Sequence, residues 1–328
     1  MKRVVASASA RVSLFGEYSK LIGESLTISL DQLQTKTLIS LNSREKHSVF
    51  SREFNERVNF KIPKFVNKWS DYVAASLNIL KKNHYQIPYL DFDISSDIPP
   101  NAGLASSSAL TVAIINGIST LLSLNLSQDK IAKLSYLVET SELNIPCSYM
   151  DFYSCTIGGV QYIKYNPTSI SHIKNYRLPK KAKIIIIETG MGKNTQEIIT
   201  RIFKAHREGD EKITNHINLE RRLIREALIL LNNDFPDLEQ LGELMQQAHL
   251  SYQINLQSSS SLHDQVCKTA MKAGCYGAKI SGGGFGGACF ALVSEKQEEQ
   301  VKNALAKISK SVIISSVSYS GSQVNKPT

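Results

Sequence analysis

Residues 99–109 read Pro-Pro-Asn-Ala-Gly-Leu-Ala-Ser-Ser-Ser-Ala and are the most informative stretch of this sequence. Two adjacent prolines predict a loop, because proline neither continues a strand ladder nor fits a helix interior. An apolar helix is expected directly afterwards, over about Ser107–Leu122. Small residues let backbone N–H groups approach a ligand, and the positive end of the helix points at the same place. The stretch indicates a phosphate-binding loop, although a serine N-cap on a structural helix would give the same pattern.

This stretch, here called the phosphate loop, supplies the candidate nucleotide-binding residues. They are Pro99, Asn101, Ala102, Gly103, Leu104, Ala105, Ser106, Ser107 and Ser108. The hydroxyl of Ser107 is also a candidate ligand for a magnesium ion. The loop is not of the Walker A type, since the sequence contains no GxxxxGK[ST] pattern.

A second glycine-rich stretch, Gly282–Gly287, contains five glycines in six residues. It lies between two expected strands, Ala278–Ser281 and Ala288–Val293. A flexible hairpin would explain it, but so many glycines cost conformational entropy. We therefore expect the backbone here to approach a ligand or another loop closely.

Composition and charge are those of an ordinary globular protein. Hydrophobic residues make up 42% and charged residues 20% of the 328 residues, and the net charge is +9. Lysine and arginine are spread along the chain and mixed with acids, as in Arg207–Lys212. Without a basic cluster, a nucleic-acid surface is not expected. A mild positive field does suit a polyanionic substrate such as a nucleotide.

The cysteines and the N-terminus bear on the compartment. The five cysteines are odd in number and form no CxxC pair, which argues against a disulfide framework or a zinc site and fits a reducing cytoplasm. The first residues are interrupted by serine and arginine and predict a strand rather than a signal peptide. No apolar run approaches the roughly 18 residues that span a membrane. We expect a cytoplasmic protein without a membrane partner.

The chain is long for one core, and its pattern changes near residue 175. In the first part, helices are expected at about 66–81, 107–122 and 127–142. They alternate with short β-type segments at 3–7, 12–15, 26–30, 35–42, 90–94 and 160–164. Residues 165–180 are interpreted as a connection. The second part opens with Ile184–Ile187, an apolar run typical of a buried strand, and is then mostly helical, with helices expected at about 195–204, 216–232, 238–254 and 262–273. We predict two α+β domains, residues 1–175 and 176–328.

Three motifs together resemble those of the GHMP kinases, the family of galactokinase, homoserine kinase, mevalonate kinase and phosphomevalonate kinase. They are residues 8–17 (ASARVSLFGE), the phosphate loop, and residues 278–287 (AKISGGGFGG). They occur in the family's order and span nearly the whole chain. The resemblance implies an N-terminal domain like domain 2 of ribosomal protein S5 and a C-terminal ferredoxin-like domain. It also implies ATP and Mg²⁺ as cofactors and a small-molecule acceptor.

A further pattern is similar to one in galactokinases: a glutamate, six residues, Pro or Asn, Cys, two residues, and Met-Asp. Here it comprises Glu139, Pro146-Cys147 and Met150-Asp151. The resemblance implies that Ser107 and Glu139 hold Mg²⁺ and that Asp151 lies at the reacting hydroxyl with Arg11 beside it. Because arginine stays protonated, Asp151 is the only candidate base of that pair.

The acceptor side departs from galactokinase. Galactokinases typically continue the first motif as GEHTDYN, whereas this chain reads GEYSKLIG over residues 16–23. The spacing to Gly23 is more similar to mevalonate kinase. Glu17, Lys20, Gly283 and Gly284 are the candidate acceptor-binding residues. Lys20 would attract an anionic acceptor such as a uronic acid, a sugar phosphate or mevalonate, unless it only points to solvent.

We therefore predict an ATP-dependent kinase that phosphorylates a hydroxyl of a sugar or sugar derivative and is most similar to galactokinase. Mevalonate kinase and heptose-phosphate kinase are the alternatives within the family. A ligand sensor that kept the fold and lost the chemistry is disfavoured, because the four residues Arg11, Ser107, Glu139 and Asp151 are all present. The sequence does not give the oligomeric state.

Overall fold

The computed structural model describes residues 2–325 except 63–64, 67, 167–168 and 193–194. The strands are β1 (Arg3–Phe15), β2 (Glu24–Leu41), β3 (His47–Ser51), β4 (Glu56–Phe60), β5 (Leu90–Ser96), β6 (Val160–Asn166), β7 (Ser169–Tyr176), β8 (Ala182–Glu188), β9 (Gly277–Ile280), β10 (Ala288–Ser294), β11 (Ser311–Ser315) and β12 (Gln323–Asn325). The helices are α1 (Ser19–Ile22), α2 (Asp71–Lys82), α3 (Ser106–Leu121), α4 (Gln128–Leu137), the π-helical turn η1 (Val138–Glu142), α5 (Tyr149–Ile157), α6 (Thr195–Arg207), α7 (Glu211–Leu231), α8 (Leu238–Ile254), α9 (Ser261–Lys272) and α10 (Glu298–Leu305).

The first sheet has the order β12-β1-β2-β5-β3-β4. In addition, β6 pairs with β2, and β7 pairs with β6. Its centre is the long antiparallel pair β1 and β2, which runs from Arg3↔Ser40 to Phe15↔Leu26. We expected two short strands in place of each, and this was wrong. A register shift between Ser9 and Ala10 lets both strands continue past the irregularity.

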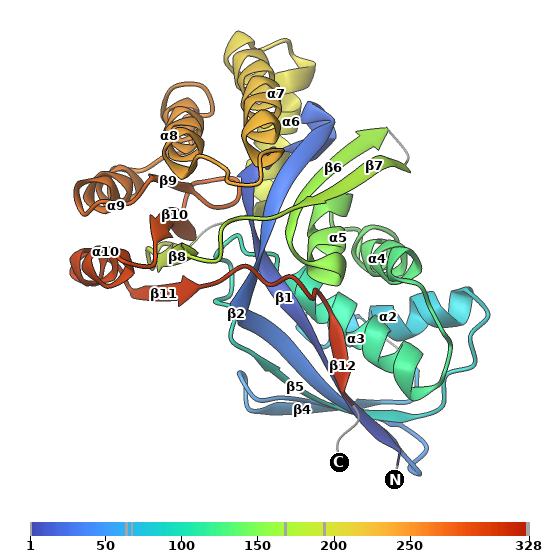
Figure 1. Cartoon of the computed structure of the whole chain (residues 1–328). Coiled ribbons are helices and arrows are strands. Elements are labelled where there is room, and N and C mark those ends of the chain that lie inside the picture. Colours follow the sequence, from blue (N-terminus) through green and yellow to red (C-terminus); the bar gives the residue numbers. More distant parts are fainter. Residues whose placement is uncertain (1, 63–64, 67, 167–168, 193–194, 326–328) are drawn as a thin grey trace.

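Helices α2 to α5 gather on one face of this sheet, as Figure 1 shows. Helix α3 packs against β1 and β2. It is buried along most of its length, which explains why its sequence is apolar on almost every side. Packing therefore holds the start of α3, where the phosphate loop ends, against the middle of the sheet.

The second sheet has the strand order β11-β8-β10-β9, and its pairs are antiparallel. This is the order of a ferredoxin-like unit, so the expected C-terminal architecture is confirmed. Ile184–Ile187 form the buried part of β8, as predicted. The second sheet begins at Ala182, while β12 returns to pair with β1 beside the N-terminus (Figure 1). The boundary near residue 175 stays a prediction.

Several elements were missed or misplaced. Strands β3, β4 and β7 and helix α5 were not expected, and β7 occupies part of the stretch interpreted as a connection. Helix α7 begins at Glu211 rather than at His216, because the Asp210 side chain accepts hydrogen bonds from the backbone N–H groups of Lys212 and Ile213. The signal for this cap was present in the sequence, and it was overlooked.

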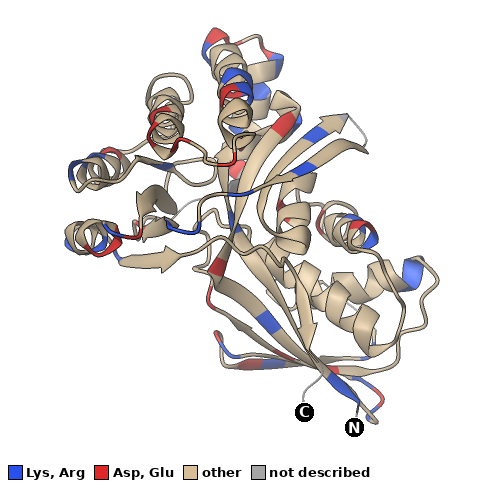
Figure 2. Cartoon of the chain, viewed as in Figure 1, with Lys and Arg blue, Asp and Glu red and all other residues tan. Residues whose placement is uncertain are grey.

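Charged residues are spread over the structure, and the cysteines are unpaired. Figure 2 shows basic and acidic residues mixed along the helices of both halves. All five cysteines are free thiols. Within the part of the chain that the structure describes, no helix is long and apolar enough to cross a membrane.

His216 on α7 lies at the junction of the two halves. It is 1% exposed, its Nδ1 lies 2.9 Å from Ser251 Oγ, and the rings of Tyr18 and Tyr252 meet its ring edge-on. Burial, with a smaller effect from Lys279, lowers its pKa to about 3. His216 is therefore neutral in the folded protein at every pH where the protein is ordinarily handled.

Stability should consequently fall as the pH drops from about 6.5, the pKa of an unfolded histidine, towards 3. Below pH 6.5 the unfolded chain binds a proton that folded His216 does not accept. We expect His216 to account for a loss of about 2 kcal/mol in the free energy of unfolding between pH 7 and pH 5. Urea titrations at both pH values should show a smaller loss in His216→Asn. The exposed His172→Asn is the control, and equal losses in all three proteins would contradict the assignment.

Candidate active site

A cavity of about 730 Å³ opens between the two halves of the chain. It brings together most of the candidate residues named from the sequence. Those that line it are Arg11, Glu17, Lys20, Asn101, Ala102, Gly103, Leu104, Ala105, Ser106, Ser107, Glu139, Asp151 and Gly283. Pro99, Ser108 and Gly284 do not line this cavity, and Ser108 is buried in the first turn of α3.

The phosphate loop has an unusual backbone. Asn101, Gly103 and Ala105 have φ values of +57°, +79° and +60°, so left-handed residues alternate with ordinary ones. Alternation of this kind can turn successive N–H groups towards one side and create a concavity that binds anions. Only Gly103 adopts this conformation without steric cost. The strain at Ala105, directly before α3, is typical of a functional loop.

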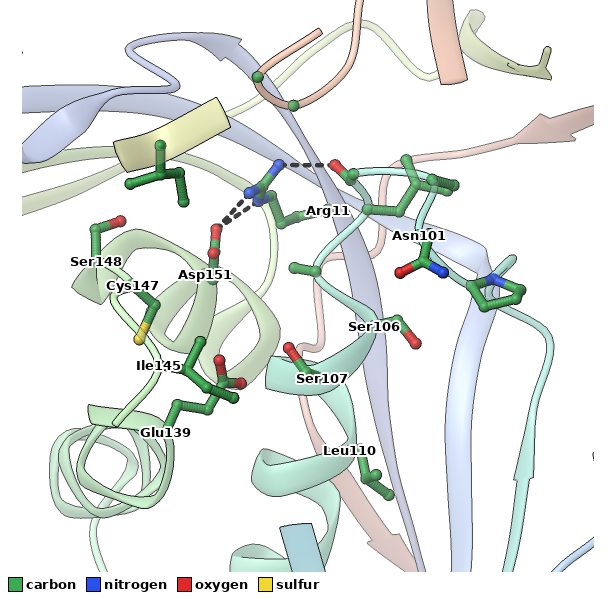
Figure 3. A pocket seen from close by; sticks show the side chains of 18 of the residues that line it. Arg11, Asn101, Ser106, Ser107, Leu110, Glu139, Ile145, Cys147, Ser148 and Asp151 are labelled. Atoms are coloured by element: carbon green, nitrogen blue, oxygen red, sulfur yellow. Dashed lines mark hydrogen bonds and ion pairs between the residues drawn. The ribbon is translucent and has the colours of Figure 1, made fainter. Parts of the chain in front are cut away.

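Arg11 joins three parts of the site. Its Nε donates to Asp151 Oδ1 at 2.6 Å, and its Nη1 donates to the carbonyl oxygen of Gly103 at 3.2 Å (Figure 3). Its Nη2 contacts Glu17 Oε1 at 3.3 Å. The guanidinium comes from β1, while Asp151 lies in the first turn of α5. Because Arg11 is 3% exposed, these bonds fix its plane and also the direction of the Asp151 carboxylate.

Burial raises the pKa of the Asp151 carboxyl above its ordinary value. Arg11 acts in the opposite direction and lowers this pKa, while the neighbouring charge of Glu17 raises it. The side chain of Asp151 remains 18% exposed at the cavity surface. A carboxylate that is both held in place and easier to protonate than usual is suited to accepting a proton.

Glu139 lies in the π-helical turn η1, and Figure 3 shows its side chain pointing towards Ser107. It is 3% exposed, and its Oε1 has no hydrogen-bond partner. Burial raises its pKa to about 8, although hydrogen bonding with Ser107 and Ser108 lowers it. An unpaired buried carboxylate oxygen beside a hydroxyl fits a divalent cation such as Mg²⁺, which takes few protein ligands when phosphates supply the others.

Residues 16–23, here called the acceptor segment, form the turn from β1 through α1 to β2. Glu17, Tyr18, Ser19 and Lys20 all line the cavity. Lys20 is exposed, and its Nζ lies 5.9 Å from the centre of the Tyr136 ring. Lys20 therefore lies at the cavity surface, where both solvent and a ligand can reach its ammonium group.

The glycine-rich stretch packs against the phosphate loop. Ser281 Oγ donates to the Gly103 carbonyl oxygen at 3.0 Å, and the Ala288 N–H donates to Ala102. The Gly283 carbonyl oxygen accepts from Tyr18 Oη at 3.1 Å. A Cβ atom on Gly284, which has φ +86°, would lie 2.5 Å from a backbone oxygen. The expectation of a close backbone approach is confirmed, and the partners are neighbouring loops.

Sequence reasoning missed several residues that line the cavity. Phe54 and Trp69 are among them, and their rings are stacked with centroids 6.0 Å apart. Helix α6 contributes Ile198, Phe203 and Arg207. These residues belong to no motif, and only the packing of the chain brings them to the cavity. Phe54 lies in none of the elements expected from the sequence, and Trp69 lies within the helix expected at about 66–81, so neither position indicated a cavity.

Comparison with known proteins places these features in a family. Residues 71–159 match the GHMP kinases N-terminal domain, and residues 224–310 match the GHMP kinases C-terminal domain. A mevalonate kinase from Pyrococcus horikoshii is 30% identical over 319 residues, which cover 91% of each chain. A galactokinase from Pyrococcus furiosus is 25% identical over an alignment of 338 positions, gaps included, which covers 94% of each chain.

Solved structures support the same fold. The mevalonate kinase of Methanococcus jannaschii superposes with a TM-score of 0.82 at 24% identity and covers 96% of this chain and 98% of that one. The galactokinase of Lactococcus lactis in complex with galactose gives 0.81 at 20% identity, covering 99% and 95%. The two-domain fold expected from the motifs is therefore confirmed. The chain belongs to the GHMP kinase family and is a phosphotransferase that acts on a hydroxyl group.

Proposed function

We propose that this protein transfers the γ-phosphoryl group of ATP to a hydroxyl of a sugar or sugar derivative that carries a negative charge. The strongest support is the arrangement inside one cavity. The phosphate loop lies on one side, Glu139 and Ser107 lie next to it, and the Asp151 carboxylate held by Arg11 lies beyond them. A phosphoryl group bound to the loop would have a candidate base on its acceptor side.

The nucleotide would lie along the start of α3. Its phosphates would accept hydrogen bonds from the backbone of the phosphate loop, with the positive end of α3 behind them. The stacked rings of Phe54 and Trp69 offer an apolar surface for the adenine base. Pro99 and Ser108 would support the loop from outside the cavity rather than contact the nucleotide.

Mg²⁺ would be held by Glu139 and Ser107 together with the phosphates, and it would neutralise charge on the transferred group. Asp151 would orient the acceptor hydroxyl and take its proton. Arg11 cannot act as a base, and in this position it would stabilise the negative charge that develops as the proton leaves the hydroxyl. Positioning and electrostatics of this kind are the main contributions that a protein makes to phosphoryl transfer.

The acceptor would lie between the acceptor segment and α6. Glu17 can accept hydrogen bonds from sugar hydroxyls, and Gly283 lies in the wall of the cavity, where a Cβ atom would come within 2.8 Å of Tyr18 Oη. Lys20 and Arg207 both line the cavity, so two cations besides Arg11 are available to an acceptor. This positive charge favours an anionic acceptor over plain galactose.

Mevalonate is a second candidate acceptor. It is an anion, and relatives named mevalonate kinase are 28–30% identical to this chain over nearly its whole length. The apolar side chains of Ile145, Ile198 and Phe203 also line the cavity and would suit the methyl and methylene groups of that molecule. The acceptor panel described below separates the two candidates.

Replacing Asp151 by Asn should lower kcat by about 10²–10⁴-fold, because the amide keeps the shape and loses the ability to take a proton. Binding of ATP should persist, since the amide nearly preserves the shape of the side chain and its oxygen can still accept the bond from Arg11. ADP release measures kcat, and calorimetry measures nucleotide binding. A variant with more than about half of the normal turnover would remove Asp151 from the mechanism.

Binding of Mg²⁺ with ATP should release a proton at pH 7, because the pKa of Glu139 is about 8 before a cation binds. Affinity for the magnesium complex should therefore decrease as the pH falls below 8. Calorimetry in two buffers of different ionisation enthalpy measures the proton released. Glu139→Gln should bind the complex more weakly and release no proton. Glu142→Gln is the matched control, because Glu142 lies in the same turn but pairs with Lys82. Identical proton release by both variants would argue against a metal at Glu139.

Replacing Lys20 by Asp should depress kcat/KM for an anionic acceptor by about 10–150-fold, since a hydrogen bond to a charged group is worth about 1.5–3 kcal/mol. Use of neutral galactose should change little. An ADP-release panel of galactose, galacturonate, a heptose phosphate and mevalonate provides the test and identifies the acceptor. If the wild-type protein prefers galactose and Lys20→Asp changes nothing, the charged-acceptor proposal is wrong and a neutral sugar takes its place.

A further inference from the structure

Two consecutive residues of α7 hold the acceptor segment at both of its ends. Glu220 Oε2 accepts a hydrogen bond of 2.6 Å from the backbone N–H of Gly16, where the segment begins. Arg221 donates from Nε to the carbonyl oxygen of Ile22 at 2.7 Å and from Nη2 to that of Leu21 at 3.2 Å. The segment lies in the N-terminal half of the chain, and α7 lies in the C-terminal half.

Each contact suits the part of the backbone that it meets. The Leu21 and Ile22 carbonyls end the short helix α1, where backbone oxygens lack partners within the helix and attract a cation. Gly16 has φ +84°, and its backbone is enclosed, since a Cβ atom there would lie 2.5 Å from the Glu24 carbonyl oxygen. All of these contacts are made to backbone atoms, so they fix where the segment lies whatever its side chains do.

Burying the Glu220 carboxylate costs more free energy than a purely structural contact requires. It is 2% exposed, and its Oε1 has no partner. Burial raises its pKa, while Lys279 and the Gly16 amide lower it. Lys279 is itself 1% exposed, and its Nζ donates to the carbonyl oxygen of Ser13 at 3.2 Å. A buried acid and a buried base from the C-terminal half therefore both bind the backbone on either side of Phe15, directly before Glu17.

The segment held in this way carries side chains that line the cavity, and it contains no residue of the phosphate loop. Glu17 and Lys20 lie between the two anchored ends, and Glu17 contacts Arg11. Because the reacting groups of an enzyme must be held to within a fraction of an ångström, a small shift of this segment would misplace the acceptor and leave the nucleotide where it is.

We propose that Glu220 and Arg221 are positioning residues that set the acceptor segment from the C-terminal half of the chain, so that α7 controls acceptor recognition without touching the acceptor. The proposal rests on the proposed function in one respect, which is that Glu17 and Lys20 face the acceptor. It adds a source of specificity that lies outside the cavity.

The main test is Arg221→Met, which keeps the apolar stem and removes both donors. We expect KM to rise by about tenfold or more for whichever of galactose, galacturonate, heptose phosphate and mevalonate the wild-type protein uses best. KM for ATP should stay within about twofold. Arg221→Lys keeps one charged donor group, so its acceptor KM should lie between those of the wild-type protein and Arg221→Met. Arg222→Met is the matched control, because Arg222 is the next residue, is exposed and pairs only along the surface, with Glu226 and Gln247.

A second measurement does not depend on the acceptor. Hydrogen exchange in the ligand-free protein should become faster over residues 16–23 in Arg221→Met and in Glu220→Gln, and should be unchanged over residues 99–109. Faster exchange together with the selective rise in acceptor KM supports the proposal. A general loss of stability would raise both KM values or lower kcat alone, and either result would overturn it.

The controls separate this inference from the proposed function. If Glu17→Gln and Lys20→Asp raise acceptor KM and Arg221→Met does not, the positioning role is wrong and the site assignment stands. If none of the three variants changes acceptor KM, the segment does not face the acceptor, and both proposals fail. Faster exchange over residues 16–23 without any change in acceptor KM would show a structural contact only and would also overturn the proposal.

Discussion

The site depends on one buried cation, the guanidinium of Arg11. It bonds to Asp151 on α5, to Glu17 in the acceptor segment and to the Gly103 carbonyl in the phosphate loop. A guanidinium has five donors in one plane, so satisfying it aligns three segments that are far apart in the sequence. Arg11 pairs with two carboxylates, so removing Asp151 or Glu17 would leave it one charged partner and would free one of the segments that it holds.

A second layer of contacts joins the two halves of the chain around this cation. Ser281 donates to the same Gly103 carbonyl that Arg11 binds, and Tyr18 reaches across to Gly283. Helix α7 adds the anchors at the ends of the acceptor segment. The phosphate loop, the acceptor segment and the glycine-rich stretch thus form one hydrogen-bonded unit. These polar bonds hold the two halves together around the cavity, beside the apolar core that runs through both halves.

The sequence predicted the parts of the molecule that local chemistry decides. The phosphate loop was recognisable because prolines, small residues and an apolar helix occur together, and the strand Ile184–Ile187 because its apolar run is continuous. It predicted poorly where tertiary pairing decides. The strand β7 is mostly exposed and has neither an apolar run nor an alternating pattern, so the sequence there indicated a connection. The residues of α6 that line the cavity belong to no motif, so their place there could not be predicted.

By itself, the sequence determined the family, the phosphate loop and the residue types of the candidate site, because three motifs in a fixed order carry that information over nearly the whole chain. Only the tertiary structure decided which of these residues share one cavity. It excluded Gly284 from the wall and brought in Phe54, Trp69 and Arg207. It also decided what holds the acceptor segment, since Glu220 and Arg221 are 204 and 199 residues away from Gly16 and Ile22, their backbone partners. A hydrogen bond to a backbone atom leaves no pattern in the sequence of the segment it holds, so only the folded chain reveals it.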